Sequence, residues 1–161
     1  MICALRTPLG IIAVEQGPSG ICRVVLPPAC DGVKVDAIAP PGLVAVFTDF
    51  FALRPIRAGV HLDLVGTSFQ RDVWAAIASI KAGRTRSYGQ IACDIGRPKA
   101  TRAVGNACGK NPVPLLVPCH RVVAGDGARG GFSSPMWIKH ALLDHEAGLN
   151  DLAGPVEPVC G

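Results

Sequence analysis

One stretch of the sequence, Pro118-Cys119-His120-Arg121, contains residue types that could do covalent chemistry. Only the thiolate of a cysteine attacks as a nucleophile, and a nearby base makes the thiolate available. The stretch follows an apolar run at residues 113–117 and precedes a Gly-rich loop at residues 125–131. The same dipeptide also fits a small buried cysteine beside a satisfied core histidine. The surrounding residues must decide between the two readings.

Basic residues gather in the half of the chain that contains this stretch. None of the net charge of +4 falls in residues 1–66, where five Lys/Arg balance five Asp/Glu. Residues 81–129 hold nine Lys/Arg against Asp94 and Asp126. A basic surface concentrated in one region favours a polyanion such as DNA as partner.

The composition is that of a globular protein without a membrane span. The chain has 161 residues, 49% of them apolar, and no apolar run reaches the roughly 18 residues of a transmembrane helix. The N-terminus lacks a basic region followed by a long apolar stretch, so it does not predict a secretory signal. We expect a cytoplasmic protein, or a nuclear one if the source is eukaryotic.

The seven cysteines are odd in number and form no Cys-x-x-Cys pair. Reduced thiols are the simpler account for a chain long enough to fold without disulfides. Cys22 and His61 could meet across a small sheet and bind zinc, but two ligands without a motif are a weak signal. We therefore expect no cofactor, with zinc at this pair as the weakly supported exception.

The N-terminal part of the chain predicts a small α+β domain. Short β-branched runs in the first 26 residues, separated by Gly/Pro turns, predict an antiparallel meander. Apolar residues at helical spacing from Leu43 to Leu53 predict a helix whose apolar face covers the meander. Alternation over Ala58 to Leu64 predicts one more strand, and the domain is expected to end near Val65-Gly66.

Residues 67–149 predict a helical domain, and residues 150–161 a flexible tail. Three helices are expected first, over Phe69 to Ile80 with Thr67 or Ser68 as cap, over Tyr88 to Ile95 with Ser87 as cap, and over Ala100 to Gly109. The short basic turn between the second and third suggests a helix-turn-helix. A last helix is expected to have Ser134 as its cap, Pro135 at its first position and its end before Gly148.

Two features of these helices bear on function. The helix at residues 100–109 has a small-residue face and carries Arg102, so it could approach a DNA backbone closely or pack on another helix. In the last helix, Ile138, Leu142 and Glu146 lie four apart, which directs Glu146 toward the core. A buried carboxylate requires a partner; otherwise Glu146 tilts out to solvent.

Several segments match one family in order and spacing. They are Phe69-Gln70 with Val73-Trp74, Ser87-Tyr88-Gly89-Gln90-Ile91-Ala92, Arg102-Ala103-Val104-Gly105, Asn111-Pro112, Pro118-Cys119-His120-Arg121-Val122-Val123, and Lys139 with Leu142-Leu143 and Glu146. With these segments the chain closely resembles the O6-alkylguanine-DNA alkyltransferases, also called methylated-DNA–protein-cysteine methyltransferases. The N-terminal half matches only loosely, through the turn at Thr7-Pro8-Leu9-Gly10.

The resemblance implies an α+β fold with two subdomains. Residues 1–66 would form an RNase-H-like antiparallel-sheet subdomain, and residues 67–149 a helical subdomain with a winged-helix-like helix-turn-helix. A monomer would bind double-stranded DNA through the minor groove and flip the damaged nucleotide into a pocket. Cys119 would then take a methyl or other alkyl group from O6-alkylguanine, and from O4-alkylthymine, irreversibly and once per molecule.

The resemblance also assigns roles to individual residues. Cys119 would be the nucleophile, and His120 the base that withdraws its proton through a water. A water suits this pair, since neighbours in an extended segment point to opposite sides. Glu146 would orient His120, Tyr88 would donate a proton or hydrogen bond to the leaving guanine, and Arg102 would fill the gap left by the flipped base.

The remaining implied roles concern the turn, the pocket and the DNA surface. Asn111 would brace the turn beneath the active-site segment. Pro114 and residues 122–133, Phe132 and Ser133 among them, would line the pocket. Further contacts to DNA or substrate would come from Thr101, Ala103, Gly105 and Arg121. Phe132 stands where the family usually has tyrosine, and Ser133-Ser134-Pro135 replaces a Gly-rich run, so the alkyl-size preference is left open.

Two other functions fit part of the sequence. A non-catalytic protein that recognises alkylation damage, or regulates through DNA, could use the same scaffold. Cys119 argues against it, because related alkyltransferase-like proteins lack the reactive cysteine. A thiol hydrolase with Cys119, His120 and Asn111 as its triad would leave Arg102 and the basic cluster without a purpose.

Overall fold

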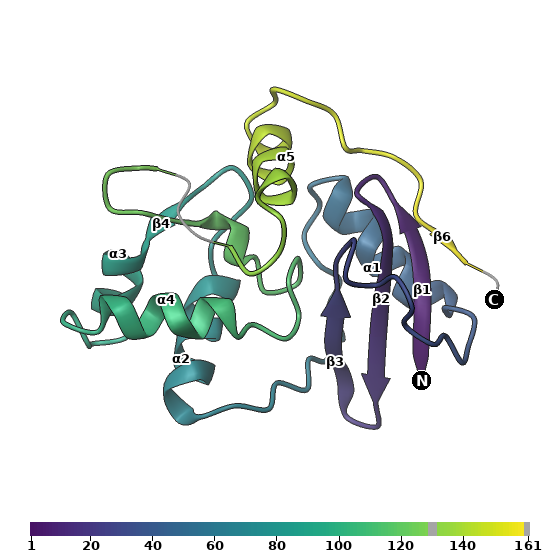
Figure 1. Ribbon diagram of the computed structural model, residues 1–161, viewed down its shortest axis with the longest axis horizontal. Helices are drawn as coiled ribbons and strands as arrows, with labels where there is room; N and C mark the ends of the chain where they lie inside the picture. The colour runs from purple at the N-terminus through teal and green to yellow at the C-terminus, as the bar shows by residue number, and fades with distance from the viewer. Residues whose placement is uncertain (129–131, 160–161) are drawn as a thin grey trace. The chain divides into compact units, whose positions relative to one another are not determined.

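The computed structural model describes residues 1–128 and 132–159, which form two compact units (Figure 1). Unit 1 consists of residues 1–64 together with the segment from Asn150 onward, and unit 2 consists of Val65–Leu149. Unit 1 holds an antiparallel sheet and unit 2 is mainly helical. The expected α+β class is therefore confirmed.

The sheet of unit 1 is the predicted antiparallel meander. Strand β1 (Ile2–Thr7) pairs with β2 (Gly10–Gly17), and β2 pairs with β3 (Gly20–Val25). Both turns use a glycine with positive φ, +106° at Gly10 and +142° at Gly20, which an L side chain rarely adopts. These turns fix the register that pairs residues 3–5 of β1 with residues 12–14 of β2, all of which are buried.

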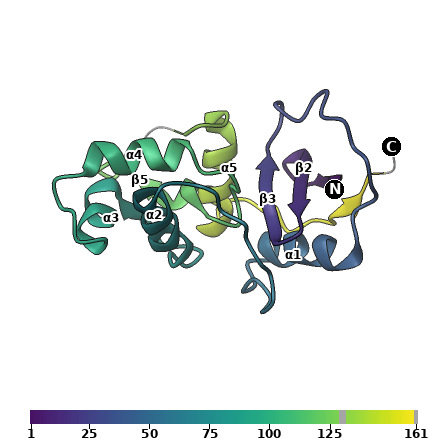
Figure 2. The same cartoon turned by 90° about the horizontal axis from the view of Figure 1, so that it is seen from below.

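One helix, α1 (Pro41–Phe51), covers a face of this sheet (Figures 1 and 2). Its apolar residues recur at helical spacing, and the buried ones include Leu43, Val46 and Phe47. The helix predicted from this pattern is thus confirmed within two residues at each end. Burial of this stripe, rather than intrinsic propensity, stabilises a helix of this length.

Two expectations for unit 1 were wrong. Residues 58–64 do not form a strand; they contribute only an isolated parallel bridge between Leu62 and Ile21, because Gly59, with φ +89°, turns the chain where the alternation begins. The expected flexible tail has a defined path instead: strand β6 (Glu157–Pro158) pairs with β1, and Val156 is buried. Only two residues of this segment pair with β1, which is too few to produce a strand periodicity in the sequence.

Unit 2 begins with the three expected helices. They are α2 (Ser68–Ala78), α3 (Tyr88–Asp94) and α4 (Thr101–Gly109), with strand β4 (Arg86–Ser87) before α3. Thr67 and Ser87 form capping boxes, each with a glutamine three residues on, so both helix starts follow from local sequence. The indole of Trp74 donates to the carbonyl of Ala107 at 2.9 Å and joins α2 to α4.

The rest of unit 2 carries the Cys119 segment and the last helix. Cys119–Arg121 form a short 3-10 helix, and strand β5 (Val122–Val123) runs parallel to β4. Helix α5 spans Met136–Glu146, and Pro135 occupies its N-cap rather than its first position. The predicted Ser134 cap was therefore wrong by one residue, and no side chain caps this helix end. In the ranges described, no helix is long and apolar enough to cross a membrane.

Candidate active site

A braced turn presents the thiol of Cys119. The amide nitrogen of Asn111 donates to the carbonyl of Val117 at 2.7 Å, and its oxygen accepts from the amide of Val113 at 3.1 Å. Leu115, between these contacts, is buried with a φ of +76°, a strained value for a branched side chain. The side-chain bridge and the burial hold the turn in a shape that its sequence alone disfavours.

The segment after the turn differs from the expected extended backbone. The amide of Arg121 donates to the carbonyl of Pro118 at 2.9 Å and closes the 3-10 turn that contains Cys119 and His120. Cys119 and His120 therefore do not lie in the extended segment that was predicted to point them to opposite sides. Pro118 causes the difference, because it has no N–H for a strand ladder and favours a turn.

Cys119 lies on the wall of a cavity of about 340 Å³. The lining residues are contributed by α3, α4, the 3-10 turn and the segment before α5: Tyr88, Gly105, Cys108, Gly109, Cys119, Phe132 and Ser133. Of the residues assigned to the site by sequence, the cavity thus unites Tyr88, Cys119, Phe132 and Ser133 with Gly105. Cys108 and Gly109 were not anticipated, although their spacing of three and four from Gly105 puts them on its face of the helix.

Behind the cavity wall, Glu146 is held by three residues from two segments, the 3-10 turn and the loop after α2. His120 Nε2 lies 2.8 Å from Glu146 Oε1, and Arg121 donates to the carboxylate from Nη2 at 2.8 Å and from Nε at 3.0 and 3.1 Å. The backbone amide of Gly83 donates to Oε2 at 3.1 Å. The Glu146 side chain is 3% exposed and that of His120 1%, so the carboxylate points inward, as its spacing predicted.

Burial and pairing set the protonation of this group of residues. Burial would raise the pKa of Glu146, but hydrogen bonds from His120 and Arg121 outweigh it and lower the pKa to about 2. Burial lowers the pKa of His120 below its usual 6.5, against the opposing pull of Glu146. The resting pair is therefore a neutral imidazole on a carboxylate. Nε2–H donates to Glu146, and Nδ1 is the basic nitrogen.

The thiols and the phenol of the cavity are protonated at neutral pH. Burial raises the pKa of Cys119, while the Asn111 amide and the charge of Lys139 pull the other way. Burial raises the pKa of Cys108 to about 12 and also raises that of Tyr88. Cys119 consequently needs a base before it can attack, and Tyr88 keeps a proton to give.

The outer face of α4 is open. Thr101, Arg102 and Ala103 are exposed, and Arg102 has no hydrogen bond or ion pair within the described part of the chain. A Cβ added at Gly105 would come no closer than 3.9 Å to Tyr88, and one at Gly109 would meet nothing within 4 Å. The packing of unit 2 therefore does not require these two glycines. The alternative that the small-residue face exists for helix packing loses support at these positions.

Two assigned residues lie elsewhere than expected. Arg121 was expected to contact DNA or substrate, but it is 9% exposed, grips Glu146 and donates from Nη1 to the carbonyl of Ile80 at 2.6 Å. Pro114 is buried and is not one of the described residues that line the cavity. Residues 129–131 of the expected pocket stretch lie outside the described residues. The sequence around Arg121 does not indicate whether its side chain points to solvent or to the interior.

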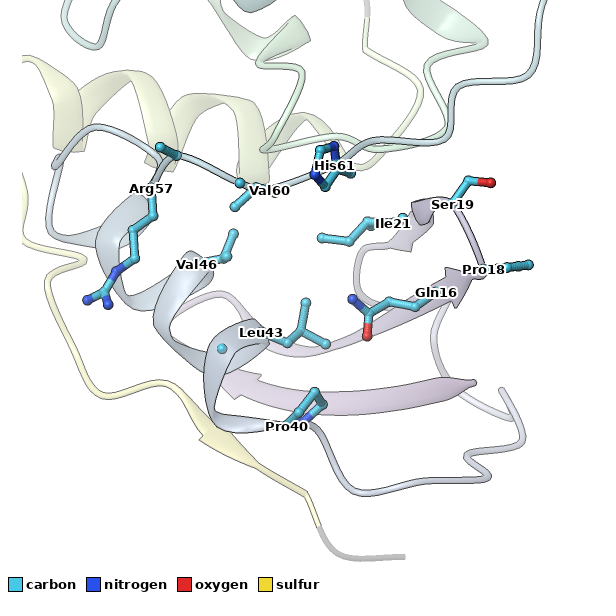
Figure 3. Close-up of a pocket in the computed structure, with 15 residues that line it drawn as sticks. Gln16, Pro18, Ser19, Ile21, Pro40, Leu43, Val46, Arg57, Val60 and His61 are labelled. Atoms are coloured by element: carbon cyan, nitrogen blue, oxygen red, sulfur yellow. The ribbon is translucent and has the colours of Figure 1, made fainter.

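Unit 1 contains a larger cavity, about 540 Å³, with different chemistry. Figure 3 shows Ile21, Leu43, Val46 and Val60 around it, with the Arg57 guanidinium directed away. The Cys22 thiol donates to the carbonyl of Glu15, and no cluster of three or more His, Cys, Asp or Glu able to hold a metal occurs among the described residues. Volume alone would select this cavity, but its polar groups do not converge.

Unit 2 combines two short helices joined by a tight turn, α3 and α4, with a cavity whose wall carries the buried Cys119. This combination is typical of a DNA-binding protein with a reactive cysteine. A family model described as 6-O-methylguanine DNA methyltransferase, DNA binding domain, matches residues 68–148. The methylated-DNA–protein-cysteine methyltransferase of Mycobacterium tuberculosis is 47% identical over 105 residues, 65% of this chain and 64% of that protein. The protein of the same name from Salmonella typhimurium is 41% identical over 117 residues, 72% of this chain and 68% of its own.

The fold agrees with these sequence matches. The crystal structure of Mycobacterium tuberculosis OGT in complex with DNA gives a TM-score of 0.80 at 35% identity, with 93% of this chain and 94% of that chain covered. The sequence alignment spans slightly less than two thirds of the mycobacterial protein. The chain belongs to the methylated-DNA–protein-cysteine methyltransferase family.

Proposed function

We propose that this protein repairs DNA by moving a methyl or other alkyl group from O6-alkylguanine, and from O4-alkylthymine, onto its own Cys119. The observation that carries the proposal is the position of Cys119: a buried thiol on the wall of a small cavity, next in sequence to the His120–Glu146 pair. The cavity is bordered by the open face of α4. A flipped base can therefore reach the thiol from bound DNA.

The chemistry follows from the protonation states. Neutral His120 takes the proton of Cys119 through a water, and ionised Glu146, held in place by Arg121, stabilises the imidazolium that forms. The thiolate attacks the alkyl carbon in line, so an S–C bond forms as the C–O6 bond breaks and the guanine keeps the electron pair. Tyr88 donates a proton or hydrogen bond to the leaving base. The thioether is stable, so each molecule reacts once.

DNA binding is assigned to α4. The open positions at Gly105 and Gly109 allow the helix to approach a minor groove closely, with Thr101 and Ala103 beside the backbone and Arg102 in the space of the flipped base. One monomer per lesion suffices, because unit 2 contains the cysteine, its base and the helix face. Arg121 is assigned to Glu146 rather than to DNA.

The decisive experiment uses O6-benzylguanine and mass spectrometry. The protein should gain one benzyl group, located on Cys119, and Cys119→Ala should gain none. Cys108→Ala is the matched control, because Cys108 lines the same cavity but its pKa of about 12 keeps it a thiol; this variant should still react.

Other results would favour the alternatives. Binding to damaged duplex with an unmodified Cys119 in the folded protein would select the non-catalytic damage-recognition protein. Catalytic turnover of an ester would revive the thiol hydrolase, against which Nε2 of His120 is bonded to Glu146 rather than to Asn111. Alkylation of Cys108 instead of Cys119 would overturn the assignment of the nucleophile.

A further inference from the structure

The exposed face of α4 carries an amide that the proposed chemistry leaves unused. Asn106 is exposed, and within the described residues its side chain makes no hydrogen bond. It follows Arg102 by four residues, so the two side chains leave the helix about 40° apart and project from one face. Gly109, three residues after Asn106, leaves space on this side of the helix for a groove wall to come close, since an added Cβ there would meet nothing within 4 Å.

We infer that Asn106 reads a base pair beside the lesion and makes repair depend on sequence context. The inference rests on the proposed function, since it takes Arg102 to stand at the flipped base. Four residues advance a helix by about 6 Å, and base pairs are about 3.4 Å apart. Asn106 therefore reaches a pair within about two steps of the lesion.

The chemistry of the amide selects one kind of pair. An asparagine side chain has an acceptor oxygen and two N–H donors. In the minor groove, every pair offers N3 or O2 acceptors, but only G·C adds a donor, the 2-amino group of guanine. Asn106 can use its donor and its acceptor together only on G·C. On A·T its oxygen loses both water and partner. Duplexes with G·C at this step should therefore be repaired faster.

The other exposed polar residue one turn further on provides a contrast. Lys110 is a point charge with donors only, so it suits a phosphate rather than a base edge. Its removal should slow transfer equally in all sequence contexts and weaken the dependence on salt. Replacement of Asn106 by alanine raises helix propensity, so Asn106→Ala should fold as well as the parent.

The test measures single-turnover transfer from O6-methylguanine duplexes at sub-saturating protein. The pair at each of the two steps on either side of the lesion is G·C, A·T or inosine·C, which lacks only the 2-amino group. At one step, G·C should react about three- to tenfold faster than the other two, the factor that one net hydrogen bond supplies. Asn106→Ala should react equally with all three pairs, and Lys110→Ala should keep the preference.

The outcomes separate this inference from the proposed function. Equal rates in the parent protein, or a preference that survives in Asn106→Ala, would overturn the role of Asn106 while transfer itself stands. A preference abolished by 7-deazaguanine but not by inosine would place the contact in the major groove and also overturn it. No transfer from any duplex would instead reject the proposed function.

Discussion

Each unit buries a carboxylate, and the two are held in opposite ways. In unit 1, Asp49 of α1 pairs with Arg54, at 2.9 Å, and with Arg57, whose side chains are 57% and 62% exposed. In unit 2, Glu146 pairs with His120 and Arg121, whose side chains are 1% and 11% exposed. The partners of Asp49 lie within eight residues of it, and those of Glu146 come from 25, 26 and 63 residues away.

This difference distinguishes an anchor from a reactive group. Water around Arg54 and Arg57 screens their attraction for Asp49. This cluster therefore only stabilises the C-terminal end of α1. The Glu146 cluster is shielded from water, so the same charges act strongly on each other and on the imidazole beside Cys119. Buried charge with long-range partners, rather than a large cavity, marks the reactive unit.

The largest expected effect comes from the removal of one carboxylate in each unit. Glu146→Ala leaves the Arg121 charge buried without its partner, which should cost about 3–5 kcal/mol of unfolding free energy. Asp49→Ala leaves its arginines in water and should cost clearly less. Both tryptophans, Trp74 and Trp137, lie in unit 2, so urea unfolding followed by their fluorescence reports on that unit, and amide hydrogen exchange reports on unit 1.

The comparison fails if the two variants lose similar stability. Replacement of a buried pair by apolar groups is often neutral. The double variant Glu146→Ala/Arg121→Met should therefore recover part of the loss.

The sequence alone could predict parts of this arrangement. The i, i+4 spacing was enough to turn Glu146 inward, because the helix repeat is a local property. The two capping boxes likewise located the starts of α2 and α3. Arg121 was misjudged because its orientation depends on the Ile80 carbonyl and the Glu146 carboxylate, which it contacts only in the folded chain. Its neighbours in sequence do not encode these contacts. Cys108 was overlooked because its chemistry comes only from a cavity it shares with Cys119.

Long-range pairing also decides the two segments of unit 1 whose structure differs from the expectation. The alternation of residues 58–64 is a strand pattern, but a strand also needs a partner edge, and only Leu62 finds one, at Ile21. The pairing of β6 with β1 involves two residues of β6, which no periodicity can signal. Contacts between segments far apart in sequence decide such short pairings.

Acid should destabilise unit 2 in two steps. Burial lowers the pKa of His120 in the folded state, so stability is lost as the pH falls from about 6.5 through the lowered value. The folded pKa of Glu146 is about 2 against 4.5 when unpaired, so stability is lost again as the pH falls from 4.5 toward 2. This second loss is at most about 3 kcal/mol.

Tryptophan fluorescence in urea between pH 7 and pH 3 measures this dependence. Glu146→Gln should flatten the lower step, because an amide does not titrate. Asp49→Asn should leave the fluorescence profile unchanged, since its carboxyl belongs to unit 1. An unchanged lower step in Glu146→Gln would show that another group controls the acid response.

Glycine-to-alanine substitutions should have opposite effects on stability in the two units. At Gly20 of unit 1, φ is +142° and an added Cβ would run into the carbonyl of His61, so Gly20→Ala should disrupt the β2–β3 turn. Gly105→Ala of unit 2 meets only Tyr88 at 3.9 Å and should raise stability by up to about 1 kcal/mol through helix propensity.

The same Gly105→Ala substitution should have the opposite effect on affinity for DNA. A methyl group at Gly105 should weaken duplex binding by about 1–3 kcal/mol, the usual cost of overpacking a close contact. Fluorescence anisotropy with a lesion-containing duplex measures this, and reaction with free O6-benzylguanine checks that the site itself is intact. Full DNA affinity in Gly105→Ala would mean that the groove does not approach this position.

The smallest expected effect is that of a hydroxyl added to Phe132 of unit 2, compared with one added to Phe47 of unit 1. Phe47 of α1 is fully buried, so Phe47→Tyr adds an unpaired hydroxyl to a packed core and should cost about 1–3 kcal/mol. Phe132 is half-buried on the cavity wall, and the centroid of its ring lies 5.9 Å from Lys139 Nζ. Phe132→Tyr keeps its hydroxyl near water and should change stability by less than about 0.5 kcal/mol.

The effect of Phe132→Tyr should appear in the choice of substrate instead. The added oxygen narrows the cavity and offers a hydrogen bond to the flipped base, so the rate ratio of O6-methylguanine to O6-benzylguanine should rise. Thermal unfolding of both variants and this ratio for Phe132→Tyr are measured together. If Phe132→Tyr destabilises as much as Phe47→Tyr, the cavity wall is packed like the core of unit 1. The contrast between an open cavity wall and a closed structural core would then be lost at Phe132.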